Sequence, residues 1–152
     1  MELVKGIKER RSIRKFKEQK VPRELITEIV DTARYAPSWK NTQTARYIII
    51  DDAEKIAELS SIECMANFAY NSKVAAAAPA IVLITYIKGV AGFDSDGTPS
   101  TKKGGEWQMF DAGIAAQTFC LAAYEKGLGT VIMGYFDEDE IKKVIDIPQD
   151  QA

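Results

Sequence analysis

Apolar and polar residues alternate along this chain with two different periods, and the pattern predicts both helices and strands. Apolar residues three or four positions apart are typical of amphipathic helices, whereas short β-branched runs bounded by acids or proline are typical of strands. The predicted helices cover residues 3–11, 22–34, 52–61, 65–78, 106–126 and 138–145. The predicted strands cover residues 46–51, 80–87 and 130–133. This mixture indicates an α+β fold, with one layer of helices against a small sheet.

The segment 106–126 is the longest predicted helix, and it is apolar on nearly every side between Phe110 and Tyr124. A helix that is apolar all round belongs in the middle of a protein, and Gly127 is suited to end it. Asp111 is interpreted as a cap for a neighbouring element and not as a catalytic group. Because no uncharged apolar stretch reaches about eighteen residues, we expect no membrane span.

Residues 88–105 differ in composition from the rest of the chain. The run GVAGFDSDGTPSTKKGG within them is rich in residues that favour turns, which predicts a long loop. Loops of this length in compact domains are often lids or binding loops. We therefore expect a mobile lid.

The composition is that of a single globular domain covering residues 1–152, with 46% hydrophobic residues to form a core. The chain contains no histidine, so the commonest general base and metal ligand are missing. We predict no metal site, and we expect a cofactor to supply the chemistry if the protein is an enzyme. The two cysteines lack metal-ligand spacing, and no signal peptide follows Met1, so we expect a cytoplasmic protein.

Basic residues are concentrated at the start of the chain. Eight of the first twenty residues are basic and three are acidic, although the whole chain has 20 basic and 22 acidic residues. In RRSIRKF (residues 10–16), the arginines and the Ser12 hydroxyl can surround a phosphate. Two alternatives remain open: a solvated helix end followed by a strand, and a nucleic-acid patch, which the scarcity of interleaved aromatic residues disfavours.

The segment APSWKNTQTARY (residues 36–47) is the second unusual stretch. It is typical of a loop between a helix and a strand, and this alone can explain its composition. It also contains Asn41 and Gln43, whose amides can present a donor and an acceptor to the edge of a heterocycle.

Four segments taken together resemble the flavin-dependent nitroreductase family. They are RRSIRKF, APSWKNTQ, NSKVAAAAPAIVLI from residue 71, and DAGIAAQTFCLAAYEKGLGTVIMGYFDE from residue 111. The resemblance implies a nitroreductase-like fold, with a small, mostly antiparallel sheet flanked by helices and a long buried central helix. It also implies a homodimer that holds FMN at the interface, and no role for nucleic acid.

The resemblance further implies which residues contact FMN. They are Arg10, Arg11, Ser12, Arg14, Pro37, Ser38, Trp39, Asn41, Gln43, Asn71, Met133 and Gly134. The residues up to 12 face the phosphate and ribityl chain, residues 14 and 71 face the pyrimidine side, and residues 37–43 reach a flavin held mainly by the partner. The backbone of residue 134 lies near flavin N5, where glycine permits close approach.

The implied activity is hydride transfer from NADH or NADPH to flavin N5, and then to a flat acceptor such as a nitroaromatic or a quinone, by a ping-pong mechanism. The alternatives are a flavin-binding or storage protein, or an enzyme of the same fold that catalyses dehalogenation, flavin breakdown or ene reduction. Two departures from the family stand out. Relatives usually continue with another strand and a C-terminal arm, which we expect to be absent here. Relatives also often have small residues at the positions of Trp39 and Lys40, so we expect a narrower pocket.

Overall fold

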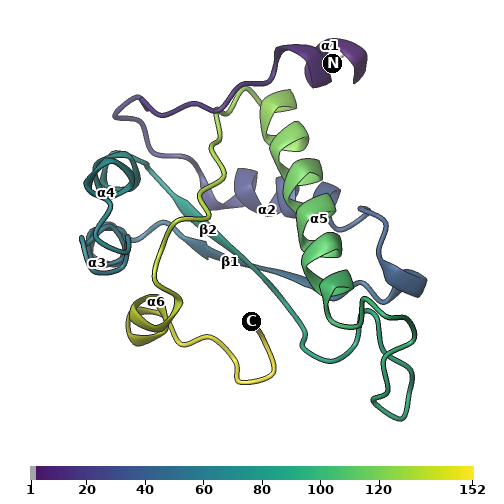
Figure 1. Ribbon diagram of the computed structural model, residues 1–152. Helices are drawn as coiled ribbons and strands as arrows, with labels where there is room; N and C mark the ends of the chain where they lie inside the picture. The colour runs from purple at the N-terminus through teal and green to yellow at the C-terminus, as the bar shows by residue number, and fades with distance from the viewer. Residues whose placement is uncertain (1–2) are drawn as a thin grey trace.

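The computed structural model describes residues 3–152, and its sheet has two antiparallel strands, β1 (Ala45–Ile50) and β2 (Ile81–Tyr86) (Figure 1). Ala45 pairs with Tyr86 at one end and Ile50 with Ile81 at the other. Both strands are found where the sequence predicts them. Residues 150–152 lie beside the end of β2, where Gln151 forms an isolated bridge with Ile87.

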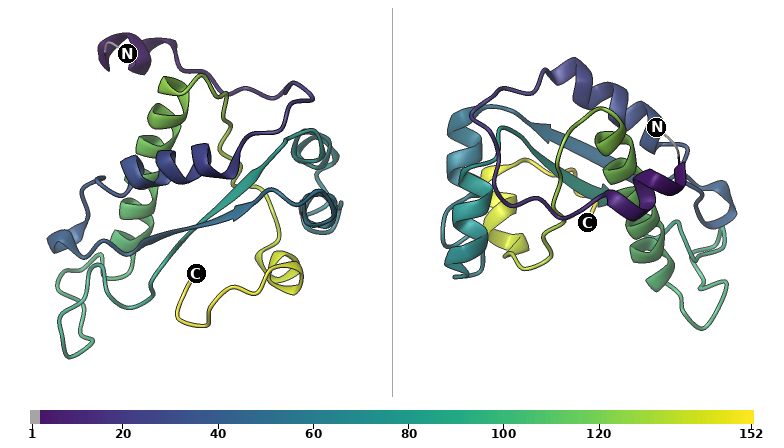
Figure 2. Two further views of the ribbon diagram at one scale, coloured as in Figure 1. Left: turned by 180° about the vertical axis from the view of Figure 1, so that it is seen from behind. Right: turned by 90° about the horizontal axis from the view of Figure 1, so that it is seen from above.

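Helices cover both faces of this sheet. Tyr47 and Ile49 contribute to a core with α2 (Arg23–Ala33) and α5 (Glu106–Glu125). The alternate residues Ile48 and Ile50 contribute to a second core. This second core involves α3 (Ala53–Leu59) and α6 (Glu138–Val144), and Figures 1 and 2 show both helices on the side away from α5. The period of two along β1 produces this arrangement, because successive side chains of a strand point to opposite faces.

The α+β fold is therefore confirmed, but the predicted single layer of helices is wrong. The sequence of β1 (ARYIII) has apolar residues at consecutive positions, which suits a strand that is covered on both sides. A one-sided sheet would instead show alternating apolar and polar residues.

The long helix α5 is buried along one face and exposed along another. Asp111, Ala115 and Phe119 are among its buried residues, whereas Met109 and Phe110 are 64% and 58% exposed. Because the sequence of α5 is apolar on nearly every side, its exposed face is an apolar surface on the single chain. In the part of the chain that the structure describes, no helix is long and apolar enough to cross a membrane.

The remaining predicted helices are present, with shorter bounds. They are α1 (Leu3–Glu9) and α4 (Ala69–Ala76). The structure also has a short 3₁₀ helix, η1 (Trp39–Asn41), within the segment predicted as a loop. The start of α4 is later than predicted, because Ala66 and Asn67 have φ angles of 47° and 61° and so interrupt the helical path.

The predicted strand at residues 130–133 is wrong. Thr130 forms only one isolated parallel bridge, with Ser12, and the residues after it have no ladder partner among those described. A β-branched run forms a strand only where it can pair with the edge of another strand. This segment instead lies next to a segment of irregular backbone.

Residues 88–105 form a loop, as predicted, but internal hydrogen bonds brace it. The Asp94 N–H donates to the Thr98 carbonyl and the Ser100 N–H to the Gly92 carbonyl, each at 2.9 Å. The chain also packs tightly at the base of the loop, since a Cβ atom built on Gly92 would lie 2.0 Å from the carbonyl oxygen of Gly104. The proposal of a mobile lid stays a prediction.

Candidate functional site

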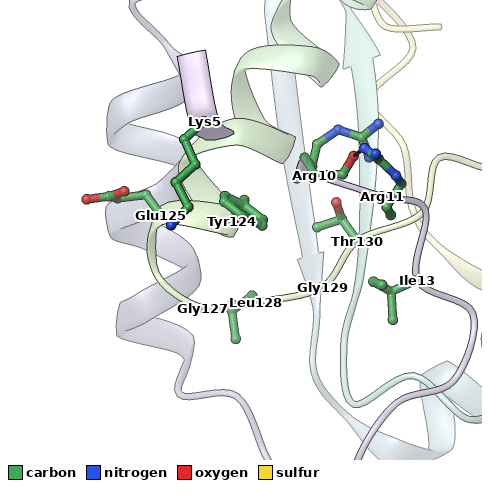
Figure 3. A pocket seen from close by; sticks show the side chains of 10 residues that line it. All are labelled: Lys5, Arg10, Arg11, Ile13, Tyr124, Glu125, Gly127, Leu128, Gly129 and Thr130. Atoms are coloured by element: carbon green, nitrogen blue, oxygen red, sulfur yellow. Dashed lines mark hydrogen bonds between the residues drawn. The ribbon is translucent and has the colours of Figure 1, made fainter. Parts of the chain in front are cut away.

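A basic pocket lies at the C-terminal end of α5, between residues 10–13 and residues 127–130 (Figure 3). Its volume is about 790 Å³. Lys5, Arg10 and Arg11 supply positive charge to its wall, and Tyr124 and Thr130 supply hydroxyl groups. The RRSIRKF segment therefore lines a concave surface, as the predicted anion site requires.

One bridge holds the two walls of this pocket together. The Ile13 N–H donates to the Thr130 carbonyl at 2.9 Å, next to the bridge between Ser12 and Thr130. The walls approach so closely that a Cβ atom on Gly129 would lie 2.8 Å from Cγ1 of Ile13. Glycine at position 129 is thus what allows the basic segment to pack against the chain after α5.

Two polar atoms of this pocket lack a partner inside the protein. The Nε atom of Arg10 and the Oγ1 atom of Thr130 are buried without a hydrogen bond among the described residues. A buried donor without a partner destabilises a fold by roughly 1–3 kcal/mol, so such atoms usually mark a missing ligand or water. An anion with several oxygen atoms would accept from both atoms. The donor set therefore fits a phosphate, and so it fits the phosphate of FMN.

The other arginines of the segment are more exposed. Arg11 Nη1 donates to the carbonyl oxygens of Lys8 (2.6 Å) and Arg10 (2.9 Å), which orients its guanidinium along the pocket edge. Arg14 is exposed and its Nη1 lies 3.4 Å from the Ser12 carbonyl oxygen. This placement leaves both guanidinium groups accessible to a ligand.

Asn71, on α4, lies beside the segment that contains Met133 and Gly134. Its Nδ2 atom donates to the carbonyl oxygen of Tyr135 at 3.1 Å. Gly134 is exposed, and a Cβ atom there would meet nothing within 4 Å. Packing within the chain therefore does not require glycine at position 134, and the close approach of a ligand there stays a prediction.

The loop of residues 37–43 forms a second group of predicted site residues, near the N-terminal part of α5. Pro37, Asn41 and Gln43 are exposed, and the Gln43 N–H donates to Ser38 Oγ at 2.8 Å. Lys40, Asn41 and Gln43 have φ angles of 45°, 56° and 51°, all in the left-handed region. This conformation costs about 1–2 kcal/mol per ordinary residue, and less for asparagine.

Contacts with the rest of the chain hold this loop. The Trp39 N–H donates to the carboxylate of Asp111, at 2.9 Å to Oδ2 and 3.1 Å to Oδ1. The rings of Trp39 and Trp107 are 4.5 Å apart between centroids. Lys40 Nζ lies 3.0 Å from Oδ1 of Asp94, in the loop 88–105.

Electrostatics also connects the two loops. The hydroxyl of Ser100, followed by the ammonium group of Lys40, holds the pKa of Asp94 below its usual range. Asp94 is therefore a carboxylate at neutral pH, and its attraction to Lys40 persists across the physiological range.

The two groups of predicted residues lie at different places on α5. Asp111, which contacts the loop 37–43, and Tyr124, which lines the basic pocket, are about 20 Å apart along the helix axis and about 140° apart around it. Figure 1 shows the same separation, with the blue segment near residue 40 at one end of α5 and α1 at the other. One chain does not bring all the predicted residues together.

The predicted set of site residues missed Thr130. Thr130 was assigned only to a strand, and its buried hydroxyl emerges from the packing of residues 10–13 against it. Asp111 was predicted to cap a neighbouring element, and its contact with Trp39 confirms this. A lone carboxylate inside an apolar helix was the signal in the sequence.

Comparison with known proteins assigns the class. The model of the nitroreductase family matches residues 7–152. Because this match covers nearly all of the chain, the protein belongs to the nitroreductase family.

Individual relatives agree with this assignment. A curated relative from Methanothermobacter thermautotrophicus, named "Putative NADH dehydrogenase/NAD(P)H nitroreductase", is 28% identical over 155 residues, which cover 98% of this chain and 71% of the relative. The solved structure of a nitroreductase family protein from Clostridium novyi NT has a TM-score of 0.81 and 28% identity, and the match covers 99% of this chain and 79% of that one. An FMN-dependent nitroreductase from Clostridium difficile R20291 has a TM-score of 0.73 and 29% identity, covering 99% and 82%.

Proposed function

We propose that this protein is an FMN-dependent oxidoreductase that uses NADH or NADPH to reduce a flat acceptor, such as a nitroaromatic or a quinone. The observation that carries the proposal is the pair of buried, unpartnered atoms, Arg10 Nε and Thr130 Oγ1, in the basic pocket. Membership of the nitroreductase family and the names of the relatives support the choice of FMN and of a nicotinamide reductant. Bound FMN would supply hydride acceptance and donation at N5, in two alternating steps.

The chain's own residues bind and orient the cofactor in this proposal. Arg10 and Arg11 would neutralise the charge of the phosphate and hydrogen-bond it, because guanidinium forks match its geometry, and the Thr130 hydroxyl would add a neutral hydrogen bond. Arg14 places a fixed positive charge near the pyrimidine side, where it favours the form of the ring that carries negative charge. The accessible backbone at Gly134 lets the ring approach the chain closely. No side chain is required to transfer a proton, which is compatible with a chain that has no histidine.

We also propose that the complete site needs two copies of the chain. The loop 37–43 and the basic pocket lie on different sides of α5. A second copy of the chain is therefore required to bring the loop 37–43 of one copy to the basic pocket of the other. The exposed apolar face of α5 supplies a surface for this contact. Met109, Phe110, Gly113 and Ile114 line a hollow of about 480 Å³ there, and nothing lies within 4 Å of a Cβ atom placed on Gly113.

A charge on this face is expected to separate the copies. Met109→Glu should convert a dimer to a monomer and weaken FMN binding at least about tenfold, because a carboxylate would be buried without a partner. Tyr35→Glu, which changes an aromatic residue that is 79% exposed near the end of α2, is the matched control and should leave the dimer intact. Sedimentation velocity and FMN titration measure both effects. A wild-type monomer that binds FMN with full affinity would contradict the two-copy site.

Steady-state kinetics test the activity. With NADH or NADPH and a quinone or a nitroaromatic varied together, double-reciprocal plots should give parallel lines, because both substrates use the same site in turn. Intersecting lines would indicate that both bind at once and would contradict the two-step exchange. A cytoplasmic location, the single domain and the narrowing of the pocket by Trp39 and Lys40 stay predictions.

A further inference from the structure

Asp111 is a buried titratable group that the proposed chemistry does not use. It is 3% exposed and lies in the second turn of α5, so it does not cap its own helix. Its carboxylate accepts a hydrogen bond from the N–H of Trp39, which is 72 residues away in the sequence. A buried carboxylate is costly unless it is paired or well hydrogen-bonded. Burial raises the pKa of Asp111, and the bond from Trp39 only partly offsets this.

Trp39, whose N–H donates to Asp111, immediately precedes the part of the loop with strained backbone. Lys40 and Asn41 follow Trp39 directly and have left-handed backbone, as does Gln43 two residues later. Such a conformation persists only where the surroundings fix it. The bond from the Gln43 N–H to Ser38 Oγ closes the loop within itself, whereas the bond to Asp111 ties the loop to the rigid helix.

We propose that Asp111 is a positioning residue: its buried carboxylate, by accepting the Trp39 N–H, fixes the loop 37–43 so that Asn41 and Gln43 are presented to the ring of a flavin bound by the partner copy. This role rests on the proposed function. A neutral amide could accept the same bond, but a charged acceptor forms a shorter and stronger one. Burial of the Asp111 carboxylate therefore lowers the stability of the fold but holds the loop 37–43 firmly.

Other aspartates of the chain show the contrast. Asp52 and Asp137 accept backbone N–H groups at the start of their own helices, α3 and α6, and Asp52 is exposed. Those side chains cap helix ends, as the preference for aspartate at such positions predicts. Asp111 instead lies in the core and accepts the N–H of Trp39, the first residue of η1, so it links two elements and does not cap its own helix.

Two variants separate the role from general stability. Asp111→Asn keeps an acceptor of the same shape, and Asp111→Leu removes the acceptor while keeping a similar volume. Asp52→Leu is the matched control, because it removes a carboxylate that accepts one backbone N–H, from Lys55, far from the loop. The folded fraction of each variant is measured first, so that the effects below are compared between folded proteins.

The first readout needs no cofactor. The chain has two tryptophans, Trp39 and Trp107, and their rings are close enough for coupled near-ultraviolet circular dichroism. Asp111→Leu should lose this coupled signal, Asp111→Asn should keep most of it, and Asp52→Leu should keep all of it. If Asp111→Leu does not fold, amide exchange in Asp111→Asn decides: the Trp39 amide should exchange faster than in the wild type, and an unchanged rate would overturn the proposal.

The second readout is FMN affinity. It should fall about tenfold in Asp111→Leu and only a few fold in Asp111→Asn, with no change in Asp52→Leu. Loss of the tryptophan signal without loss of affinity would overturn the positioning role, because the loop would move without consequence for the cofactor. Failure of the wild type to bind FMN would instead overturn the proposed function, and with it the orientation of the loop toward flavin, while the tryptophan signal would still report whether Asp111 holds the loop.

Discussion

Replacing Arg10 with alanine is expected to weaken FMN binding by about 10- to 100-fold, because a charged hydrogen-bond donor to the phosphate is lost. The Nε atom of Arg10 is buried and has no partner within the described chain, so its hydrogen-bonding capacity is available to a ligand. Riboflavin, which has the same ring but no phosphate, should bind to the variant and to the wild type with similar affinity. Titration with each compound, followed by flavin fluorescence, measures the difference.

Arg34→Ala is the matched control for this substitution. The Arg34 side chain is 67% exposed, lies 4.0 Å from Asp31 and is outside the pocket, so its loss should leave FMN affinity unchanged. An equal loss of FMN and riboflavin affinity in Arg10→Ala would contradict the phosphate assignment. It would indicate that Arg10 supports the fold around the ring.

Gly92→Ala is expected to destabilise the protein by about 2–5 kcal/mol, the largest effect on stability that the structure predicts for a single methyl group. Gly92 has a φ angle of 89°, and the added Cβ atom would lie 2.0 Å from the Gly104 carbonyl oxygen and 3.0 Å from Cδ1 of Trp107. Since a carbonyl of the backbone cannot move aside as a side chain does, the base of the loop 88–105 must open. Urea unfolding gives the free energy of unfolding for both proteins.

Gly97→Ala separates the clash from the backbone conformation. Gly97 lies in the same loop with a φ angle of 82°, but nothing lies within 4 Å of its Cβ position. Gly97→Ala should lower the free energy of unfolding by only about 1–2 kcal/mol, which is the contribution of the left-handed conformation. Equal destabilisation by both substitutions would contradict the tight packing between Gly92 and Gly104.

The sequence predicted the fold well where local pattern and burial agree. The helical spacing of residues 23–33 and the apolar runs of β1 and β2 led to elements that the structure confirms. The run after Gly129 failed as a strand because strand formation depends on a partner edge, which a local pattern does not report. The helices α3 and α6 were predicted, but their position as a second layer on the other face of the sheet was missed, since layering depends on the path of the whole chain.

The site was predictable in its chemistry but not in its geometry. RRSIRKF predicted an anion site, and two of its three arginines, Arg10 and Arg11, line the basic pocket, whereas Arg14 does not. The left-handed backbone of Lys40 and Gln43 carries no signal in the sequence, because neither residue type favours it. The distance between the pocket and the loop 37–43 also depends on the length and orientation of α5, which only the folded chain fixes.

The most direct test of the central claim is the absorption spectrum of the purified protein, reconstituted with FMN and then mixed anaerobically with NADH or NADPH. The account predicts a bound flavin band that bleaches on mixing and returns when a quinone or a nitroaromatic is added. A flavin that binds but is reduced by neither nucleotide would contradict the proposed oxidoreductase and favour storage or another reductant. Failure to bind FMN at all would contradict the assignment of the basic pocket to the flavin phosphate.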